Sequence, residues 1–437
     1  MSKINIELSL EDSLILLCCN PNPPQYRIAS IESLIAEKLD WESLFKVINR
    51  HGIQGLIYNS LDKCKNNNLV PAALMAELKR RYQWVVYRNV FFSSEFNRIL
   101  KKFNDEDIKT VALKGIALLG EVYSDIGLRE LSDIDILVKK DEVNRAETIL
   151  EELGYRREKT YFRFRGKHFH STFILQKGKN IIAVELHWDF DLSDAPFEIS
   201  IDDFWNRTEA VQLNGLIYYK LGLEDDILFS SFHIIRDSLI NHVMSLKNFC
   251  DLAEIIRIHQ HKINWKLIIE RAQQYKIERP VFLILFLLEE LFQISLPENF
   301  LKEIKGRAFQ ENLLNSIIQE RIFFKHHENT YFPTYVISTL SEQGFGSKLK
   351  NFFKIFKQIS VSFRSYDYIN SSVMKSFYFT VVEFYRASLN YMKIIYFIVI
   401  DYKKFKESMH RSIGIAKEQR EIDKWICGNH FNHSRLH

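Results

Sequence analysis

The chain of 437 residues is long enough for two or three domains with sizeable hydrophobic cores. Its hydrophobic share of 46% and charged share of 26% are those of a globular protein and exclude an intrinsically disordered one. The net charge of +4 is uneven, because residues 341–437 hold 16 Lys and Arg against 8 Asp and Glu. Such a basic region forms a solvated helical face or meets nucleic acid, anionic lipid or an acidic partner.

The five cysteines are an odd number without a repeated spacing, which is typical of reduced thiols. The apolar run at 394–400 is far shorter than the ~20 residues that a membrane span requires. The early apolar run at 14–19 follows three acidic residues, which is unlike a signal peptide. We therefore expect a cytoplasmic protein without a transmembrane segment.

In chain order, residues 1–105 are predicted to be a helical region, because apolar residues recur every three or four positions. Residues 106–220 are predicted to be an α/β domain, in which a strand ends at "LKG" and "LSDIDILV" and "AVELHWDF" form further strands. Helical periodicity returns over 221–335, and 336–437 is expected to be a basic, aromatic-rich helical region with a disordered tail. The predicted fold class is α+β, a mixed-sheet α/β unit flanked by helical regions.

The stretch "LSDIDILV" places two carboxylates in an otherwise apolar strand. Side chains at i and i+2 share a face, so Asp133 and Asp135 project together. Such a pair repels itself unless a cation lies between the two groups, and Mg²⁺ takes oxygen ligands of this kind. Glu185, inside another apolar strand, would complete the set if the two strands are neighbours. Alternatively, the aspartates cap a turn and Glu185 pairs with Arg129.

Lys114 and Gly115 lie at a predicted strand-to-helix turn. Glycine permits close approach of the backbone to a phosphate, and the amides at a helix start favour anions. Lys114 would add positive charge for a triphosphate, although a plain turn is equally compatible with the two residues. Arg129 is predicted to bind the nucleotide, because its planar guanidinium suits a phosphate, although pairing with a carboxylate is equally compatible with the sequence.

Several histidines have two interpretations each. His170 and His187 either line an acceptor pocket or belong to the edge and core of the sheet. In "FHIIRD", His233 and Arg236 either reach the nucleotide or pack a helix. The tail can bind zinc or remain disordered; its candidate ligands are Cys427, His430, His433 and His437.

Three motifs are missing from the sequence: G-x-x-x-x-G-K-[ST], G-x-S-x-G and a C-x-x-C pair. Their absence argues against P-loop hydrolysis, serine hydrolase chemistry and thioredoxin-like redox chemistry.

Taken together, "LKGIALLGEVYSDIGLRELSDIDILV" and "AVELHWDF" resemble the motifs of an uncharacterised bacterial nucleotidyltransferase family in the DNA polymerase beta-like nucleotidyltransferase superfamily. The resemblance covers roughly residues 10–330 and includes the helical flanks. It implies that a nucleoside monophosphate moves from an NTP to an acceptor hydroxyl with Mg²⁺ or Mn²⁺ as cofactor, and that pyrophosphate leaves. It assigns the metal-binding and catalytic roles to Asp133, Asp135 and Glu185. Lys114 and Gly115 would form the nucleotide-binding turn, where the superfamily usually has Gly-Gly or Gly-Ser.

The expected acceptor is a small molecule, a sugar or a protein. Two alternatives remain at this point. One is a non-catalytic nucleotide-binding or toxin–antitoxin-type partner, and the other is an RNA 3′-end nucleotidyltransferase, which the basic C-terminal region permits. Nucleic acid is not the favoured partner, and the sequence leaves the preferred NTP and the oligomeric state open.

Overall fold

The computed structural model describes residues 6–158, 169–178, 180–190, 197–241, 243–304, 312–323, 417–419 and 421–427. The chain divides into two compact units. The first comprises Met1–Asn315, Arg321–Phe323 and Ile426–His437, and it contains the whole described sheet. The second comprises Ser316–Glu320 and Phe324–Trp425, of which 316–320 and helical segments within 417–425 are described. Most of the basic C-terminal region, together with His430, His433 and His437, lies outside the described residues.

The N-terminal part is helical, as its periodicity predicts. The elements are α1 (Leu10–Cys18), α2 (Gln25–Ile35), α3 (Trp41–His51), α4 (Gln54–Asp62), the 3₁₀ turn η1 (Asn67–Leu69) and the long α5 (Ala72–Asp105). A capping box fixes the start of α1, since Ser9 Oγ accepts from the Asp12 amide while the Asp12 carboxylate accepts from the Ser9 amide. Gly52, in the left-handed conformation at φ +65°, ends α3.

The described strands form one seven-stranded mixed sheet. Its order is β3 (Arg156–Arg157), β4 (His170–Lys177), β5 (Asn180–His187), β2 (Ile134–Leu137), β1 (Val111–Leu113), β7 (Leu216–Lys220) and β6 (Glu209–Leu213). The β2–β5 and β1–β7 pairs are parallel and the other pairs are antiparallel. The predicted α+β class with a mixed sheet is confirmed.

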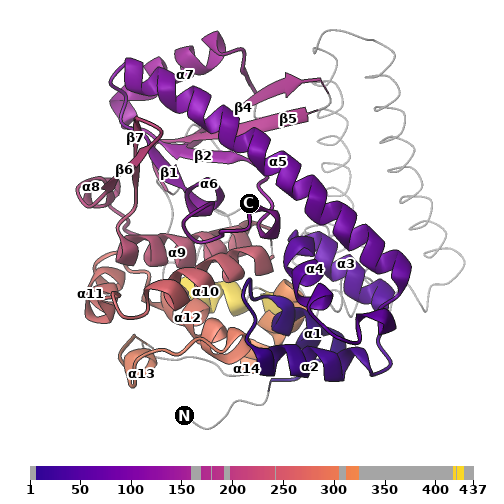
Figure 1. The fold of residues 1–437 in the computed structure, drawn as a ribbon. Helices are drawn as coiled ribbons and strands as arrows, with labels where there is room; N and C mark the ends of the chain where they lie inside the picture. Colours follow the sequence, from indigo (N-terminus) through magenta and orange to yellow (C-terminus); the bar gives the residue numbers. More distant parts are fainter. Residues whose placement is uncertain are drawn as a thin grey trace, which may run out of the picture. The chain divides into compact units, whose positions relative to one another are not determined.

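One face of the sheet is buried under helices. α5 crosses this face (Figure 1), and α7 (Val143–Glu152) packs against the same core. The core contains Ile134 and Ile136 of β2 and Val184 of β5 together with apolar residues of both helices. Because side chains alternate along a strand, Asp135 and Glu185 belong to the opposite face. The short α6 (Lys114–Leu118) follows β1 directly.

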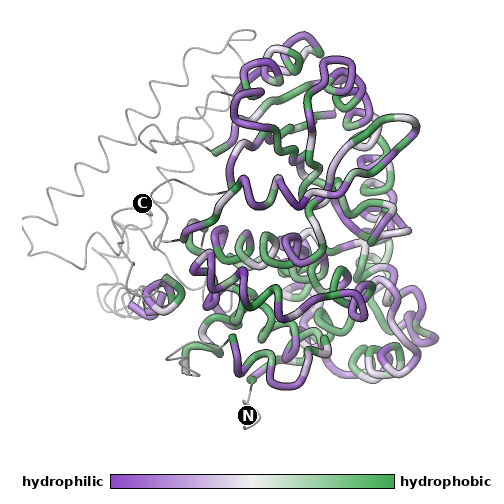
Figure 2. The backbone as a smooth tube through the Cα atoms, turned by 90° about the vertical axis from the view of Figure 1, so that its left-hand side faces the viewer, coloured by the Kyte–Doolittle hydropathy of each residue, from purple (hydrophilic) through white to green (hydrophobic). Residues whose placement is uncertain are grey.

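The remaining described elements are mainly helical. They are η2 (Ile126–Leu128), η3 (Lys140–Glu142), α8 (Ile201–Trp205), α9 (Leu223–Asn241), α10 (Leu246–His259), α11 (Trp265–Gln274), α12 (Glu278–Phe292), α13 (Phe300–Ile304), α14 (Asn312–Ser316) and a π-helical turn (Ile317–Ile322). Figure 2 shows hydrophilic and hydrophobic residues alternating along many of the elements, as amphipathic packing requires. α12 is buried along most of its length. Among the described residues, no helix combines the length and hydrophobicity that a membrane span needs.

Candidate metal and nucleotide site

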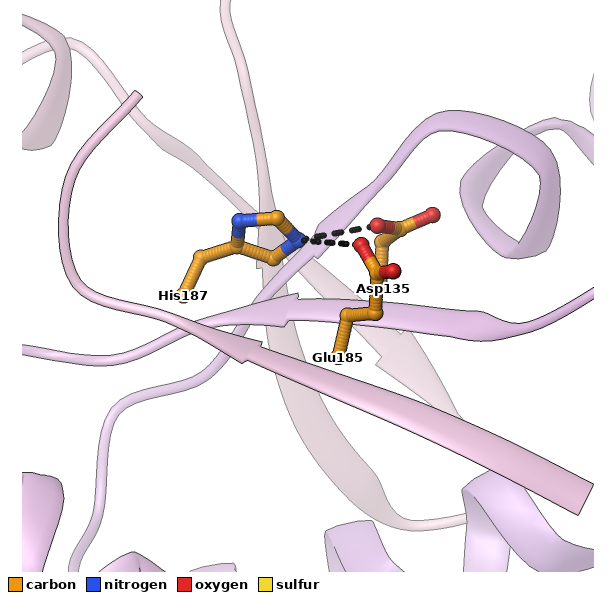
Figure 3. Close-up of side chains that lie close together, drawn as sticks. All are labelled: Asp135, Glu185 and His187. Carbon is orange, nitrogen blue, oxygen red and sulfur yellow. Dashed lines mark hydrogen bonds and ion pairs between the residues drawn. The ribbon is translucent and has the colours of Figure 1, made fainter. Parts of the chain in front are cut away.

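Two neighbouring parallel strands bring the predicted carboxylates together. β2 and β5 pair so that Asp135 lies directly beside Glu185, and Leu137 beside His187. Residues paired in this way point to the same face of the sheet, and Figure 3 shows the carboxylates meeting there with the imidazole. The strand adjacency on which the predicted metal site depended is therefore present.

The three side chains form a tight polar group. His187 Nε2 lies 2.9 Å from Asp135 Oδ1 and 3.4 Å from Glu185 Oε2. One ligand atom from each residue lies within 4.8 Å of the other two, a spacing that a single metal ion could bridge. In the part of the chain that the structure describes, no other set of three His, Cys, Asp or Glu side chains gathers this closely. Lys114 Nζ also lies 2.8 Å from Asp135 Oδ1.

These contacts keep the carboxylates ionised inside the protein. Burial alone would raise the pKa of Asp135, but the Lys114 ammonium and the His187 hydrogen bond outweigh it and hold the pKa well below its ordinary value. Burial and His187 act on Glu185 in the same opposing way, and its pKa is also lowered. In return, the charges of Asp135 and Glu185 overcome the burial of Lys114 and raise its pKa. Both the carboxylates and the ammonium are therefore charged near neutral pH.

Asp133 lies just before β2 and outside this tight group. Its carboxylate accepts a 2.9 Å hydrogen bond from Ser132 Oγ. Burial and the neighbouring charge of Asp135 raise the pKa of Asp133 to about 6. That rise is the expected response of a buried carboxylate that lies near another negative charge.

The turn between β1 and α6 requires a glycine at its second position. A Cβ at Gly115 would lie 2.6 Å from Leu131 Cδ2 and 3.0 Å from Arg129 Nη1, so a larger residue would displace them. Lys114 has a left-handed backbone at φ +51°, which is unusual outside glycine and costs energy. The turn therefore holds Lys114 against Asp135 in a strained conformation.

Arg129 pairs with a residue that the sequence did not indicate. Its Nη2 and Nε lie 2.7 and 3.0 Å from Asp251 Oδ2 in α10, and Tyr123 Oη donates to the same carboxylate. Both Arg129 and Asp251 are buried. The alternative in which Arg129 pairs with Glu185 is wrong, because the described partner of Glu185 is His187. No local signal predicts the Arg129–Asp251 pair, since 122 residues separate its members.

His170 lies beside the group from the adjacent strand. It is paired with His187 across β4 and β5, and the two ring centroids are 5.1 Å apart. Burial lowers the pKa of His170 to about 4, so its imidazole is neutral near pH 7. A cavity of about 410 Å³ has Lys114 in its lining, together with residues of α6, the end of β7 and helices α9 and α10. The sequence did not indicate this cavity.

Comparison with known proteins gives one family. A family model described as "Uncharacterised nucleotidyltransferase" matches residues 37–293, which is more than half of the chain and includes the whole site. No curated protein matches the chain. A solved structure of an antigenic nucleotidyltransferase-like protein from Paracoccidioides brasiliensis is 10% identical and covers 48% of this chain and 94% of its own. Its TM-score of 0.28 is too low to support an argument about fold or function.

Proposed function

This chain belongs to the family of uncharacterised nucleotidyltransferases, and from that premise we propose that it transfers a nucleoside monophosphate from an NTP to an acceptor hydroxyl. The observation that carries the proposal is the β2–β5 pairing, which sets Asp135 against Glu185 on one face of the sheet. A small molecule, a sugar or a protein is the proposed class of acceptor.

The donor set fits a divalent cation, for which we propose Mg²⁺ or Mn²⁺. Asp135 and Glu185 offer carboxylate oxygens within the tight group. Asp133, two residues before Asp135, would supply another. The Lys114 ammonium balances only one of these three negative charges. The remaining negative charge can be balanced by a cation. When bound, such a cation neutralises charge on the reacting phosphates and activates the attacking hydroxyl. Asp133, Asp135 and Glu185 are therefore the proposed metal-binding and catalytic residues.

The nucleotide would meet the turn that begins α6. Lys114 already lies at Asp135 and would offer its ammonium to the phosphates, while Gly115 keeps the backbone accessible. Arg129 was predicted to bind the nucleotide directly. Because its guanidinium is held by Asp251 and lies against Gly115, we propose that it positions the turn. His170 and His187 are proposed to border the acceptor.

The decisive variant is Asp135→Asn, which keeps the shape of the side chain and removes its charge. We expect it to abolish transfer of label from α-³²P-NTPs to acceptors in a cell extract, measured with Mg²⁺ or Mn²⁺. Asp141→Asn, at an exposed aspartate of η3, is the matched control and should retain transfer. Circular dichroism would check that both variants fold.

Undiminished labelling by Asp135→Asn would refute the mechanism. If the wild type binds NTP equally well with and without a divalent metal and transfers no label, the non-catalytic alternative would replace it. Steeply salt-dependent labelling of RNA ends would instead identify RNA as the acceptor.

A further inference from the structure

α9 carries an arginine, Arg236, whose surroundings hold it in place. Arg236 Nη1 donates a 2.8 Å hydrogen bond to the Phe190 carbonyl oxygen, and Nη2 lies 2.9 Å from His233 Nδ1. The guanidinium also stacks on Phe169, with Cζ 4.9 Å from the ring centroid. The side chain is 12% exposed, Nη2 also lies 3.3 Å from Asp237 Oδ1, and the buried Nε has no hydrogen-bond partner among the described residues. Together these contacts hold the guanidinium of Arg236 in one orientation.

The hydrogen bonds also fix the state of His233. A guanidinium only donates, so His233 Nδ1 accepts and the ring proton is on Nε2. That nitrogen lies 3.3 Å from Asp237 Oδ2, to which it can donate. Burial, followed by the positive charges of Lys114 and Arg236, lowers the pKa of His233 and keeps it in this neutral form. His233 thus orients Arg236 without adding charge.

A short aromatic path joins Arg236 to the carboxylates. The Phe169 ring that lies under the guanidinium is stacked against His187, with ring centroids 6.1 Å apart. His187 Nε2 in turn forms a 2.9 Å hydrogen bond with Asp135 Oδ1. The positive charge of Arg236 also opposes protonation of Lys114 and His170 on the sheet side. The guanidinium is therefore within electrostatic reach of the residues that form the proposed site.

A polyphosphate bound at this site requires positive charge besides that of a metal. Arg129, the arginine nearest to the turn in sequence, is buried against Asp251, and the Asp251 carboxylate neutralises its charge. Arg236 has two neutral partners at 2.8 and 2.9 Å, and its ion pair with Asp237, at 3.3 Å, is longer than the 2.7 Å pair between Arg129 and Asp251. A planar guanidinium also presents two parallel donors in a fixed geometry that matches two phosphate oxygens, whereas an ammonium acts as a point charge with rotatable donors.

We propose that Arg236, oriented by His233, forms the subsite for the polyphosphate chain of the nucleotide. The inference rests on the proposed function, and it places the phosphate-binding arginine on α9 and not in the strand segment that bears the carboxylates. His233 is a positioning residue in this arrangement, because it acts through Arg236.

Inorganic tripolyphosphate is the probe that tests the subsite, because it carries the charge of an NTP without base, sugar or transfer chemistry. We expect calorimetry with Mg²⁺ present to show that Arg236→Met weakens binding about tenfold or more, the usual cost of losing a charged hydrogen bond. Arg236→Lys should recover part of the affinity, because the charge returns without the fork. Arg156→Met, at an exposed arginine in β3, should bind like the wild type.

The outcomes separate this inference from the proposed function. Wild-type affinity in both Arg236 variants would overturn the subsite even if Asp135→Asn abolishes transfer. Failure of the wild type to bind tripolyphosphate would also overturn it. If Arg236→Met does not fold, a comparison of Arg236→Lys with the wild type decides alone, since equal affinity would leave no role for the fork.

Discussion

Asp226, at the start of α9, lines the 410 Å³ cavity, where burial destabilises its ionised form. Among the described residues it has no ion-pair partner, and its side chain accepts a long 3.5 Å hydrogen bond from Ser230 Oγ. Burial, reinforced by the negative charge of Asp251, raises the pKa of Asp226 from 3.8 to about 7. The folded protein therefore binds a proton at this residue more tightly than the unfolded chain does.

This difference predicts how stability depends on pH. Between about pH 4 and pH 7 the folded state holds the Asp226 proton and the unfolded state has lost it, so stability from this residue falls as pH rises. Asp226→Asn removes the cost, and its melting temperature should exceed that of the wild type at pH 8. The gap should close toward pH 4, as measured by calorimetry at both pH values. An equal gap at both values, or none, would contradict the assignment; Asp141→Asn serves as the control.

At the scale of elements, the buried pair of Arg129 and Asp251 ties α10 to the segment before β2. Loss of one partner leaves the other charge buried and unpaired, which typically lowers the free energy of unfolding by about 3–5 kcal/mol. We expect Arg129→Met to lower the free energy of unfolding by an amount in this range, measured by urea denaturation. The double variant Arg129→Met with Asp251→Asn should recover part of the loss, because no unpaired charge remains. Additive losses in the double variant would show that the two residues act independently.

Elements with a strong local pattern could be predicted from the sequence, and contacts between distant segments could not. The alternation in "LSDIDILV" correctly predicted that Ile134 and Ile136 pack in the core while Asp135 faces away from it. The interaction of Glu185 with Asp135 depends on which strands pair, which the sequence left conditional. The role of His187 as the bridge between the two carboxylates depends on the same register, so the sequence showed it only as a pocket candidate.

For the whole molecule, the predicted α+β class holds because it depends on the order of helical and strand periods along the chain, a property that survives errors in individual boundaries. The predicted domain boundaries at 105, 220 and 335 stay predictions. The roles of Arg129 and Arg236 could not be told apart from the sequence, because each is a solitary basic residue there. Only the fold distinguishes a guanidinium held by a buried carboxylate from one held by a carbonyl, a neutral imidazole and a longer ion pair.

Binding of a metal ion should stabilise the whole fold, because the carboxylates come together only when β2 and β5 pair. A ligand that binds the folded state alone adds about 2.7 kcal/mol at a concentration 100 times its Kd. We expect Mn²⁺ to raise the melting temperature of the wild type and to leave that of Glu185→Gln nearly unchanged.

Lys114 should affect metal binding, because its ammonium lies 2.8 Å from Asp135 Oδ1 and competes with a cation for that oxygen. Lys114→Met removes the competitor and leaves Asp135 and Glu185 less well balanced. The metal-free variant should therefore melt at a lower temperature than the wild type, while saturating Mn²⁺ should raise its melting temperature by more. Lys140→Met, at an exposed lysine of η3, should respond to Mn²⁺ as the wild type does. A smaller shift in Lys114→Met than in the wild type would mean that the ammonium assists cation binding, and the competition would then be refuted.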